Sequence, residues 1–206
     1  MRTKPMSGTT GDRRVQRTYR LLHEALMSLI REKGYEAITV QDILDRADVG
    51  RSTFYTHFRD KGDLLHRGLE NLDRHVRFAQ AAAEPPAGKP YEKIIGFSLA
   101  MFEHASQFRA IHRALLGSGA ETVVRRHLHS VLTEVVGREI ESQLQRRKQA
   151  KTPVATELLT HFLVSTYIST LNWWITCRNA LTPKQIDAGY RQLVLPCLAS
   201  IFGAPV

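Results

Sequence analysis

One short segment of the chain carries side chains that could bind nucleic acid. It reads Arg51-Ser52-Thr53-Phe54-Tyr55-Thr56-His57-Phe58. In a helix that turns by about 100° per residue, the two phenylalanines fall on one side, and Ser52, Thr53 and Thr56 fall on the other. No Asp or Glu stands between Arg51 and Arg59. The outer face of such a helix can donate hydrogen bonds to phosphate oxygens and base edges, although each polar residue could also be an ordinary solvated one.

The elements that must position this segment are two short helices joined by a tight turn. Thr39 opens the first helix, because Thr39-Val40-Gln41-Asp42 has the form of an N-terminal capping box. Gly50 lies in the turn before the second helix, which we expect over about residues 51–58. A longer helix, expected over residues 14–33, precedes the pair. This is the helix-turn-helix layout, in which the second helix of the pair enters the major groove of DNA.

Two neighbouring stretches of the sequence form a recognisable signature. They are Gly34-Tyr35-Glu36-Ala37-Ile38-Thr39-Val40-Gln41-Asp42-Ile43 and Val49-Gly50-Arg51-Ser52-Thr53-Phe54-Tyr55-Thr56-His57-Phe58-Arg59-Asp60-Lys61. Together they resemble the signature of the TetR/AcrR family of bacterial transcriptional regulators, and the Tyr-x-His-Phe-x-x-Lys core is its specific part. The motif match covers about residues 14–65. Beyond it, only the helical layout and the length are similar to the family.

The resemblance implies a DNA-binding role for named residues. The positions at which family members read bases are Arg51, Ser52, Thr53 and Thr56. Arg51 is the candidate for a guanine contact, because bidentate pairing of Arg with guanine is the commonest specific contact. The positions at which the family contacts phosphates are Thr39, Tyr55, His57 and Lys61. The family often has a basic arm before its first helix, so we expect Arg13 and Arg14 to approach phosphate or the minor groove; a solvated tail is the alternative.

The hydrophobic pattern of the whole chain has the helical period, so we expect an all-α fold of about nine helices. The later helices are expected over residues 61–83, 91–107, 108–116, 121–148 and 158–179, with a last one after Thr182-Pro183. We assign residues 1–60 to a basic arm and a three-helix DNA-binding domain. Residues 61–206 form a helical ligand-binding and dimerisation domain in this prediction.

The family resemblance also implies a homodimer that is paired through the last two long helices. A two-fold dimer suits two half-sites about 34–36 Å apart, so the operator is expected to be approximately palindromic double-stranded DNA. The resemblance further implies a pocket for a small hydrophobic or aromatic effector in the C-terminal half. The aromatic, soft or titratable candidates for its lining are Phe97, Met101, His104, Phe108, His112, Phe162, Tyr167, Trp173 and Trp174. At any single one of them, an ordinary core or interface role is the competing interpretation.

Composition and missing motifs exclude several other classes of protein. The 206 residues include 29 Lys and Arg against 20 Asp and Glu, a net charge of +9 that suits an anionic partner without identifying one. There is no GxSxG, Walker, GxGxxG or HExxH motif, so we expect no enzyme and no cofactor. His127 and His129 would lie about 200° apart on a helix, so we expect no metal site. Cys177 and Cys197 show no zinc-ligand spacing and are expected to be small buried residues.

These observations favour a dimeric DNA-binding transcriptional regulator, a repressor released by a small ligand. The alternative is a DNA-binding regulator without a small-molecule inducer, and a cavity in the C-terminal bundle would distinguish the two. The stretch Leu158–Cys177 carries no Asp, Glu, Lys or Arg, but its many Ser, Thr and Asn residues favour a helix buried in protein over a membrane span. Two cysteines without a disulfide framework, and a polar N-terminus without a secretion signal, lead us to expect a cytoplasmic protein.

Overall fold

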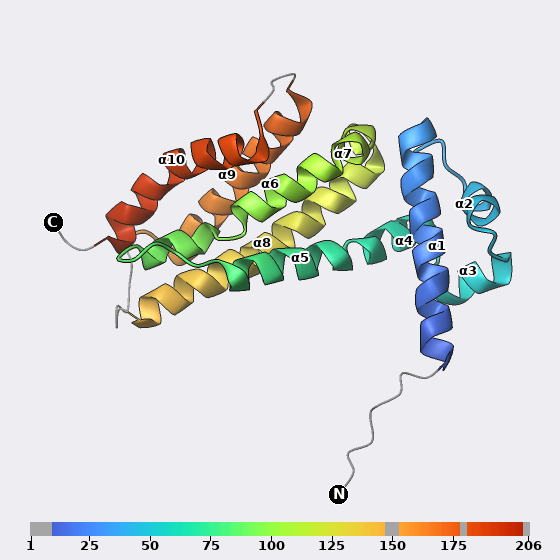
Figure 1. The fold of residues 1–206 in the computed structure, drawn as a ribbon, viewed down its shortest axis with the longest axis horizontal. Coiled ribbons are helices and arrows are strands. Elements are labelled where there is room, and N and C mark those ends of the chain that lie inside the picture. Colours follow the sequence, from blue (N-terminus) through green and yellow to red (C-terminus); the bar gives the residue numbers. More distant parts are fainter. Residues whose placement is uncertain (1–9, 147–152, 178–180, 204–206) are drawn as a thin grey trace, which may run out of the picture.

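The computed structural model describes residues 10–146, 153–177 and 181–203, and its regular elements there are all helices (Figure 1). The expectation of an all-α fold is confirmed. The first five helices are α1 (Thr10–Lys33), α2 (Val40–Ala47), α3 (Arg51–His57), α4 (Lys61–Gly68) and α5 (Glu70–Ala82). A 3-10 helix, η1 (Pro90–Ile95), leads into α6 (Ser98–Gln107), α7 (Arg109–Leu115), α8 (Gly119–Arg146), α9 (Thr156–Thr176) and α10 (Pro183–Phe202).

Two single helices expected from the sequence are each divided in the structure. The helix expected over residues 61–83 is interrupted at Leu69, whose N–H donates to the carbonyl of His66 and so tightens the last turn of α4. The helix expected over residues 91–107 begins as η1 and becomes α-helical only at Ser98. A side chain at Gly96 would collide with Ala83, so this junction requires glycine for the close approach of two chain segments.

The helices pack around two hydrophobic cores. One core joins α1, α2, α3 and α4, and it also takes in Ile111, Leu115 and Ala120 from α7 and α8. The other core fills the long bundle of α5, α6, α8, α9 and α10. Leu64 and Leu65 of α4 belong to the first core, so α4 packs with the helices that precede it. The domain boundary expected after residue 60 stays a prediction.

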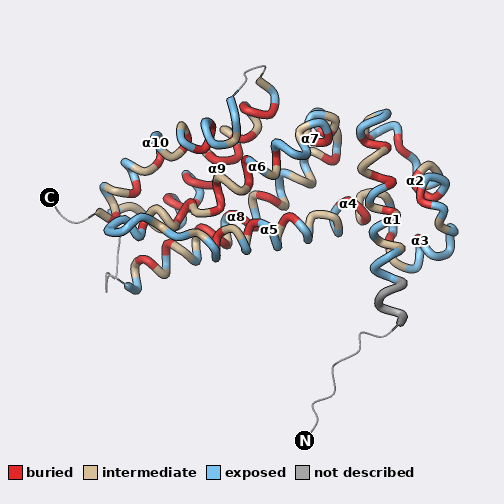
Figure 2. The backbone as a smooth tube through the Cα atoms, in the orientation of Figure 1, coloured by how far each residue is buried: buried red, intermediate tan, exposed pale blue. Residues whose placement is uncertain are grey.

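The arrangement leaves α2 and α3 free of the bundle. In Figure 1, α1 stands across one end of the bundle, and α2 and α3 lie on the side of α1 that faces away from it. Figure 2 shows buried residues along the inner sides of these helices and exposed residues on the outer side of α3. The three-helix unit therefore presents α3 to the outside, with α1 and α4 between it and the rest of the chain.

The structure also places the uncharged helix and the two cysteines. None of the helices in the described ranges is long and apolar enough to cross a membrane. Leu159, Val164, Tyr167 and Trp174 of α9 are buried in the bundle core, as its composition predicts. The expectation that both cysteines are buried is wrong, since Cys177 is half-buried and Cys197 is exposed on α10.

Candidate nucleic-acid interface and effector cavity

The start of α2 is fixed by the capping box that the sequence predicts. The hydroxyl and the backbone N–H of Thr39 each donate to Asp42 Oδ2, at 2.7 Å, and the N–H of Asp42 donates back to Thr39 Oγ1 at 3.1 Å. Lys33 Nζ lies 2.9 Å from the same carboxylate oxygen. The bond from Lys33 and those from Thr39 hold the pKa of Asp42 well below its usual range, so this cap stays ionised at neutral pH.

A bidentate ion pair joins α2 to α1. Arg46 donates to Glu32 Oε1 at 2.6 Å and to Oε2 at 2.7 Å. The Arg46 guanidinium, with a further bond from Ser28, lowers the pKa of Glu32 to about 2. The orientation of α2 on α1, and hence of the turn that leads to α3, is set by this pair and by the apolar contacts of Ile43 and Leu44.

The turn before α3 uses an uncommon backbone conformation. Asp48 adopts φ 51° and ψ 50° at the end of α2, in the left-handed region where Asp is tolerated better than most residues. Gly50 then caps α3, and the N–H of Phe54 donates to its carbonyl at 3.2 Å. The tight turn expected between the two helices is therefore present.

The side chains of α3 divide into an inner and an outer face, as their spacing predicts. Phe54 and Phe58 are buried, and their rings lie 5.4 Å apart against α1. The residues predicted to read bases are all exposed: Arg51, Ser52, Thr53 and Thr56. Thr56 Oγ1 donates to the carbonyl of Ser52 at 2.8 Å, which fixes its rotamer and leaves the oxygen able to accept. This face can therefore present a guanidinium and hydroxyls to a partner together.

The residues predicted to contact phosphate surround that face. Tyr55 is 51% exposed, with its ring held edge-on against Phe54. His57 is half-buried at the end of α3, and Thr39 is exposed at the start of α2. The hydroxyl proton of Thr39 already goes to Asp42, so a phosphate at this position would have to meet backbone N–H groups of the first turn of α2.

Lys61, which the family resemblance implies is a phosphate contact, makes hydrogen bonds within the protein. Its ammonium donates to the carbonyls of Tyr35 at 2.9 Å, Ile38 at 2.8 Å and Glu36 at 3.3 Å. It also lies 4.5 Å from the centre of the Tyr35 ring. The three N–H groups of the ammonium thus have three carbonyl acceptors in the segment between α1 and α2, and these hydrogen bonds connect α4 to that segment.

The predicted basic arm is only partly within the described residues. The helix expected from residue 14 begins at Thr10 in the structure, so both Arg13 and Arg14 belong to α1 and not to an arm before it. The basic residues before Thr10 lie outside the described residues, and the contact of Arg13 and Arg14 with DNA stays a prediction.

The residues predicted to line an effector pocket fall into three separate places. Four are packed in the bundle core: Phe97, Met101, Tyr167 and Trp174. Two are exposed on the outer side of α9: Phe162 and Trp173. Three line a cavity with a mainly apolar wall: His104, Phe108 and His112. Trp173 also borders an open hollow on the surface between α9 and α10.

That cavity lies where the two cores meet. It has a volume of about 200 Å³ and is lined by His23 and Met27 from α1, Leu65 and Gly68 from α4, Leu69, Asn71, Leu72, His104, Phe108, Ile111, His112, Leu115 and Val124. We refer to it as the junction cavity. The sequence prediction missed its α1 and α4 residues, because the family resemblance implies an effector pocket in the C-terminal half. The one signal in the sequence was His23, a polar residue among the buried apolar positions of α1.

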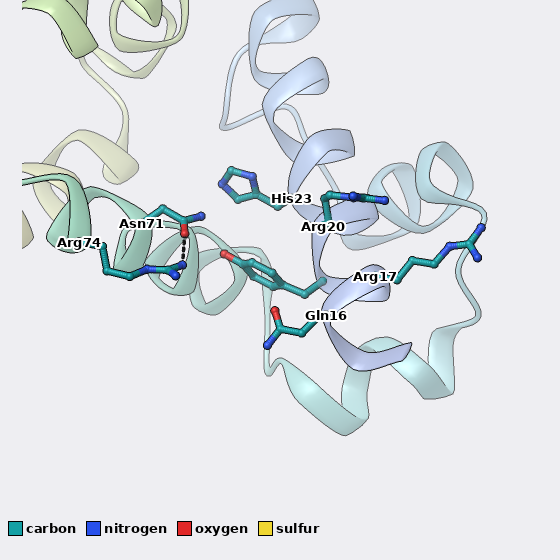
Figure 3. Close-up of a pocket in the computed structure, with 7 residues that line it drawn as sticks. Gln16, Arg17, Arg20, His23, Asn71 and Arg74 are labelled. Atoms are coloured by element: carbon teal, nitrogen blue, oxygen red, sulfur yellow. Dashed lines mark hydrogen bonds between the residues drawn. The ribbon is translucent and has the colours of Figure 1, made fainter. Parts of the chain in front are cut away.

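A second hollow, more open and more polar, lies beside the junction cavity. Figure 3 shows it between α1 and α5, lined by Gln16, Arg17, Tyr19, Arg20, His23, Asn71 and Arg74. Arg74 donates to Asn71 on α5, and the imidazole of His23 extends from α1 toward α5 (Figure 3). Because His23 and Asn71 border both spaces, they separate the polar hollow from the junction cavity.

Comparison with known proteins agrees with the sequence signature of the N-terminal region. Residues 22–67 match the family model for bacterial regulatory proteins of the tetR family. An uncharacterized HTH-type transcriptional regulator from Mycobacterium bovis is 29% identical over 133 residues. That match spans 61% of this chain and 62% of the relative, less than two thirds of its length.

One further relative and one solved structure cover most of the chain. The HTH-type transcriptional repressor KstR from Mycolicibacterium smegmatis is 24% identical over 187 residues, which is 87% of each chain. The crystal structure of a TetR-family transcriptional regulator from Syntrophomonas wolfei superposes with a TM-score of 0.73 at 20% identity, over 89% of this chain and 96% of that one. The signature at the turn and α3, the matched family model and the shared fold agree, and the chain belongs to the TetR family of bacterial regulatory proteins.

Proposed function

We propose that the protein is a dimeric transcriptional repressor that binds an approximately palindromic DNA operator and releases it when a small ligand binds. The observation that carries the proposal is the outer face of α3. Arg51, Ser52, Thr53 and Thr56 are exposed on it, and no other helix covers them in the described part of the chain. A helix of this kind, supported from behind by Phe54 and Phe58, suits insertion into the major groove.

The dimer part of the proposal is supported by apolar side chains on the outside of the last two helices. Leu193 on α10 is 77% exposed, and Trp173 on α9 is 51% exposed. Leu158 and Phe162 continue the exposed side of α9. Exposed apolar residues that gather on neighbouring helices mark surfaces that pair with another protein surface, and a second copy of this chain would supply a matching one.

The DNA-binding part is tested with DNA from upstream of the gene that encodes the protein. Fluorescence anisotropy in a series of salt concentrations should show tight binding that weakens as salt rises, because bound phosphates release counterions. Arg51→Ala should weaken binding and relax the preference for one base pair. Arg113→Ala is the matched control, since it removes another exposed arginine, from α7. Equal losses in both variants would contradict the assignment of α3 as the reading helix.

The dimer part is tested by sedimentation of two matched variants. Leu193→Asp places a charge on the exposed side of α10 and should shift the dimer toward monomer. Phe78→Asp is the control, because Phe78 is 75% exposed on α5, away from α9 and α10. A dimer that survives Leu193→Asp and is lost in Phe78→Asp would place the interface elsewhere.

A further inference from the structure

We propose that the junction cavity is the effector site and that it takes an uncharged monocyclic phenol, held between the DNA-binding helices and the C-terminal bundle. Its effect on DNA rests on the proposed repressor function, whereas the binding of the ligand does not. The size of the cavity, the chemistry of its wall and its place in the fold each support this inference.

The size of the junction cavity suits a single substituted ring. Its volume is about 200 Å³. An apolar cavity of about 150 Å³ in another protein is large enough to bind benzene. The remaining space therefore suits a ring with one or two small substituents.

The wall of the cavity combines apolar side chains with three imidazoles whose ring nitrogens hydrogen-bond to no other described residue. Met27, Leu65, Leu72, Ile111 and Leu115 supply much of the apolar surface. The imidazoles of His23, His104 and His112 also face the cavity, and none of them hydrogen-bonds to another residue within the described ranges. Each neutral imidazole offers one N–H donor and one acceptor nitrogen. A hydroxyl on the ligand can use both kinds of partner.

The residues that line the cavity also favour an uncharged ligand. Among the described residues that line the cavity there is no Lys, Arg, Asp or Glu. Burial lowers the pKa of His112, and burial with the nearby His75 and His112 lowers that of His104 to about 4. Burial likewise lowers the pKa of His23. The imidazoles are thus neutral at pH 7, and a carboxylate in the cavity would lack a counter-charge.

The position of the cavity connects ligand binding to the placement of α3. Its wall is formed on one side by α1 and α4, which carry α2 and α3, and on the other by α5, α6, α7 and α8. A ligand that fills it contacts both groups of helices. It can therefore favour a different separation between them, provided that it binds the separated arrangement more tightly than the one described.

Ligand binding is tested on the full-length protein without DNA, by 19F NMR titration with 4-fluorophenol. 4-Fluorotoluene lacks the hydroxyl and 4-fluorobenzoate carries a charge, so both should bind at least about tenfold more weakly, as expected for the loss of one buried hydrogen bond or the burial of an unpaired charge. Tight binding of 4-fluorobenzoate, or equal binding of all three, would overturn the assignment of ligand class.

The location of the site is tested by variants that fill the cavity or remove its polar groups. Val124→Phe should abolish binding of 4-fluorophenol, and Val123→Phe, the same change at a neighbouring position outside the wall, should not. Met27→Phe fills the cavity from α1 and serves if Val124→Phe does not fold. His112→Leu should weaken binding about tenfold, whereas His129→Leu should leave it unchanged. Unaltered binding in both cavity-filled variants would overturn the site.

A final measurement separates the effector site from the repressor function. In operator-bound wild-type protein, 4-fluorophenol should lower DNA affinity, and the cavity-filled variants should bind DNA but ignore the compound. Binding of 4-fluorophenol that depends on Val124, in a protein that binds no DNA, would support the site and contradict the repressor proposal. DNA binding by a protein that does not bind 4-fluorophenol would support the repressor proposal and contradict the effector site.

Discussion

The imidazole of His23 on α1 occupies the space that any side chain at position 68 on α4 would need. A Cβ atom at Gly68 would lie 2.5 Å from His23 Nε2 and 2.6 Å from Cδ2. Gly68 is the last residue of α4, directly before the interruption at Leu69. The glycine thus lets α1 approach the junction of α4 and α5, and it keeps His23 in the wall of the junction cavity.

Gly68→Ala is therefore expected to destabilise the protein by about 1–3 kcal/mol, the usual cost of overpacking, although alanine has the higher helix propensity. In a His23→Ala background the same change should be neutral or stabilising, because the colliding ring is absent. A double-mutant cycle of the free energy of unfolding, measured in urea, checks this. An equal cost in both backgrounds would show that the two residues do not interact.

Lys61 should behave as a structural residue. Replacing it with Met removes three hydrogen bonds to carbonyls between α1 and α2, so we expect a loss of about 1–3 kcal/mol in the free energy of unfolding. If the main role of Lys61 were to contact phosphate, its replacement would instead reduce the slope of log affinity against log salt concentration by about one. Urea unfolding and a salt titration of Lys61→Met and Tyr55→Phe distinguish the roles. A stable Lys61→Met protein with a reduced salt slope would restore the phosphate contact predicted from the sequence.

The elements around α3 were predictable because short-range rules determine them. Thr39 and Asp42 are three residues apart and form their cap within one turn, and the spacing of Phe54 and Phe58 fixes which side of α3 is buried. Such patterns depend on the local chain alone.

The junction cavity could not be predicted in the same way. His23 and His112 are far apart in the sequence and line the same cavity only because α1 packs against α7. Gly68 lets α4 approach α1 at the same place. Hydrophobic periodicity shows which side of a helix is buried but not against which helix it packs. For the same reason Phe162 and Tyr167, on the same helix, were grouped together as pocket residues although one is exposed and the other is buried.

The hydroxyl of Tyr19 offers a further test of the packing of α1. It is buried without a hydrogen-bond partner among the described residues, while the ring stacks on Phe58 with 6.1 Å between centroids. Tyr19→Phe removes an unsatisfied polar group and should raise the free energy of unfolding by about 1 kcal/mol. Tyr190→Phe is the contrasting variant, because its hydroxyl donates to the carbonyl of Leu163 at 3.3 Å and its loss should destabilise. Destabilisation of both variants in urea would mean that Tyr19 has a partner after all.

His104 should make the protein less stable as the pH falls below neutrality. Burial, with smaller contributions from His75 and His112, lowers its pKa to about 4, whereas an unfolded chain binds that proton near pH 6.5. Between pH 4 and pH 6.5 the unfolded state holds more protons than the folded state. The free energy of unfolding therefore decreases as the pH drops through this range. Above about pH 6.5, His104 contributes no pH dependence. His104→Phe should therefore show a smaller loss of stability between pH 7 and pH 5 than the wild type, measured by urea unfolding at several pH values. His129→Gln, which removes an imidazole outside the cavity, controls for the loss of a titratable group as such. The argument fails if His104→Phe has the same pH dependence as the wild type, because the imidazole would then be protonated equally in the folded and unfolded states.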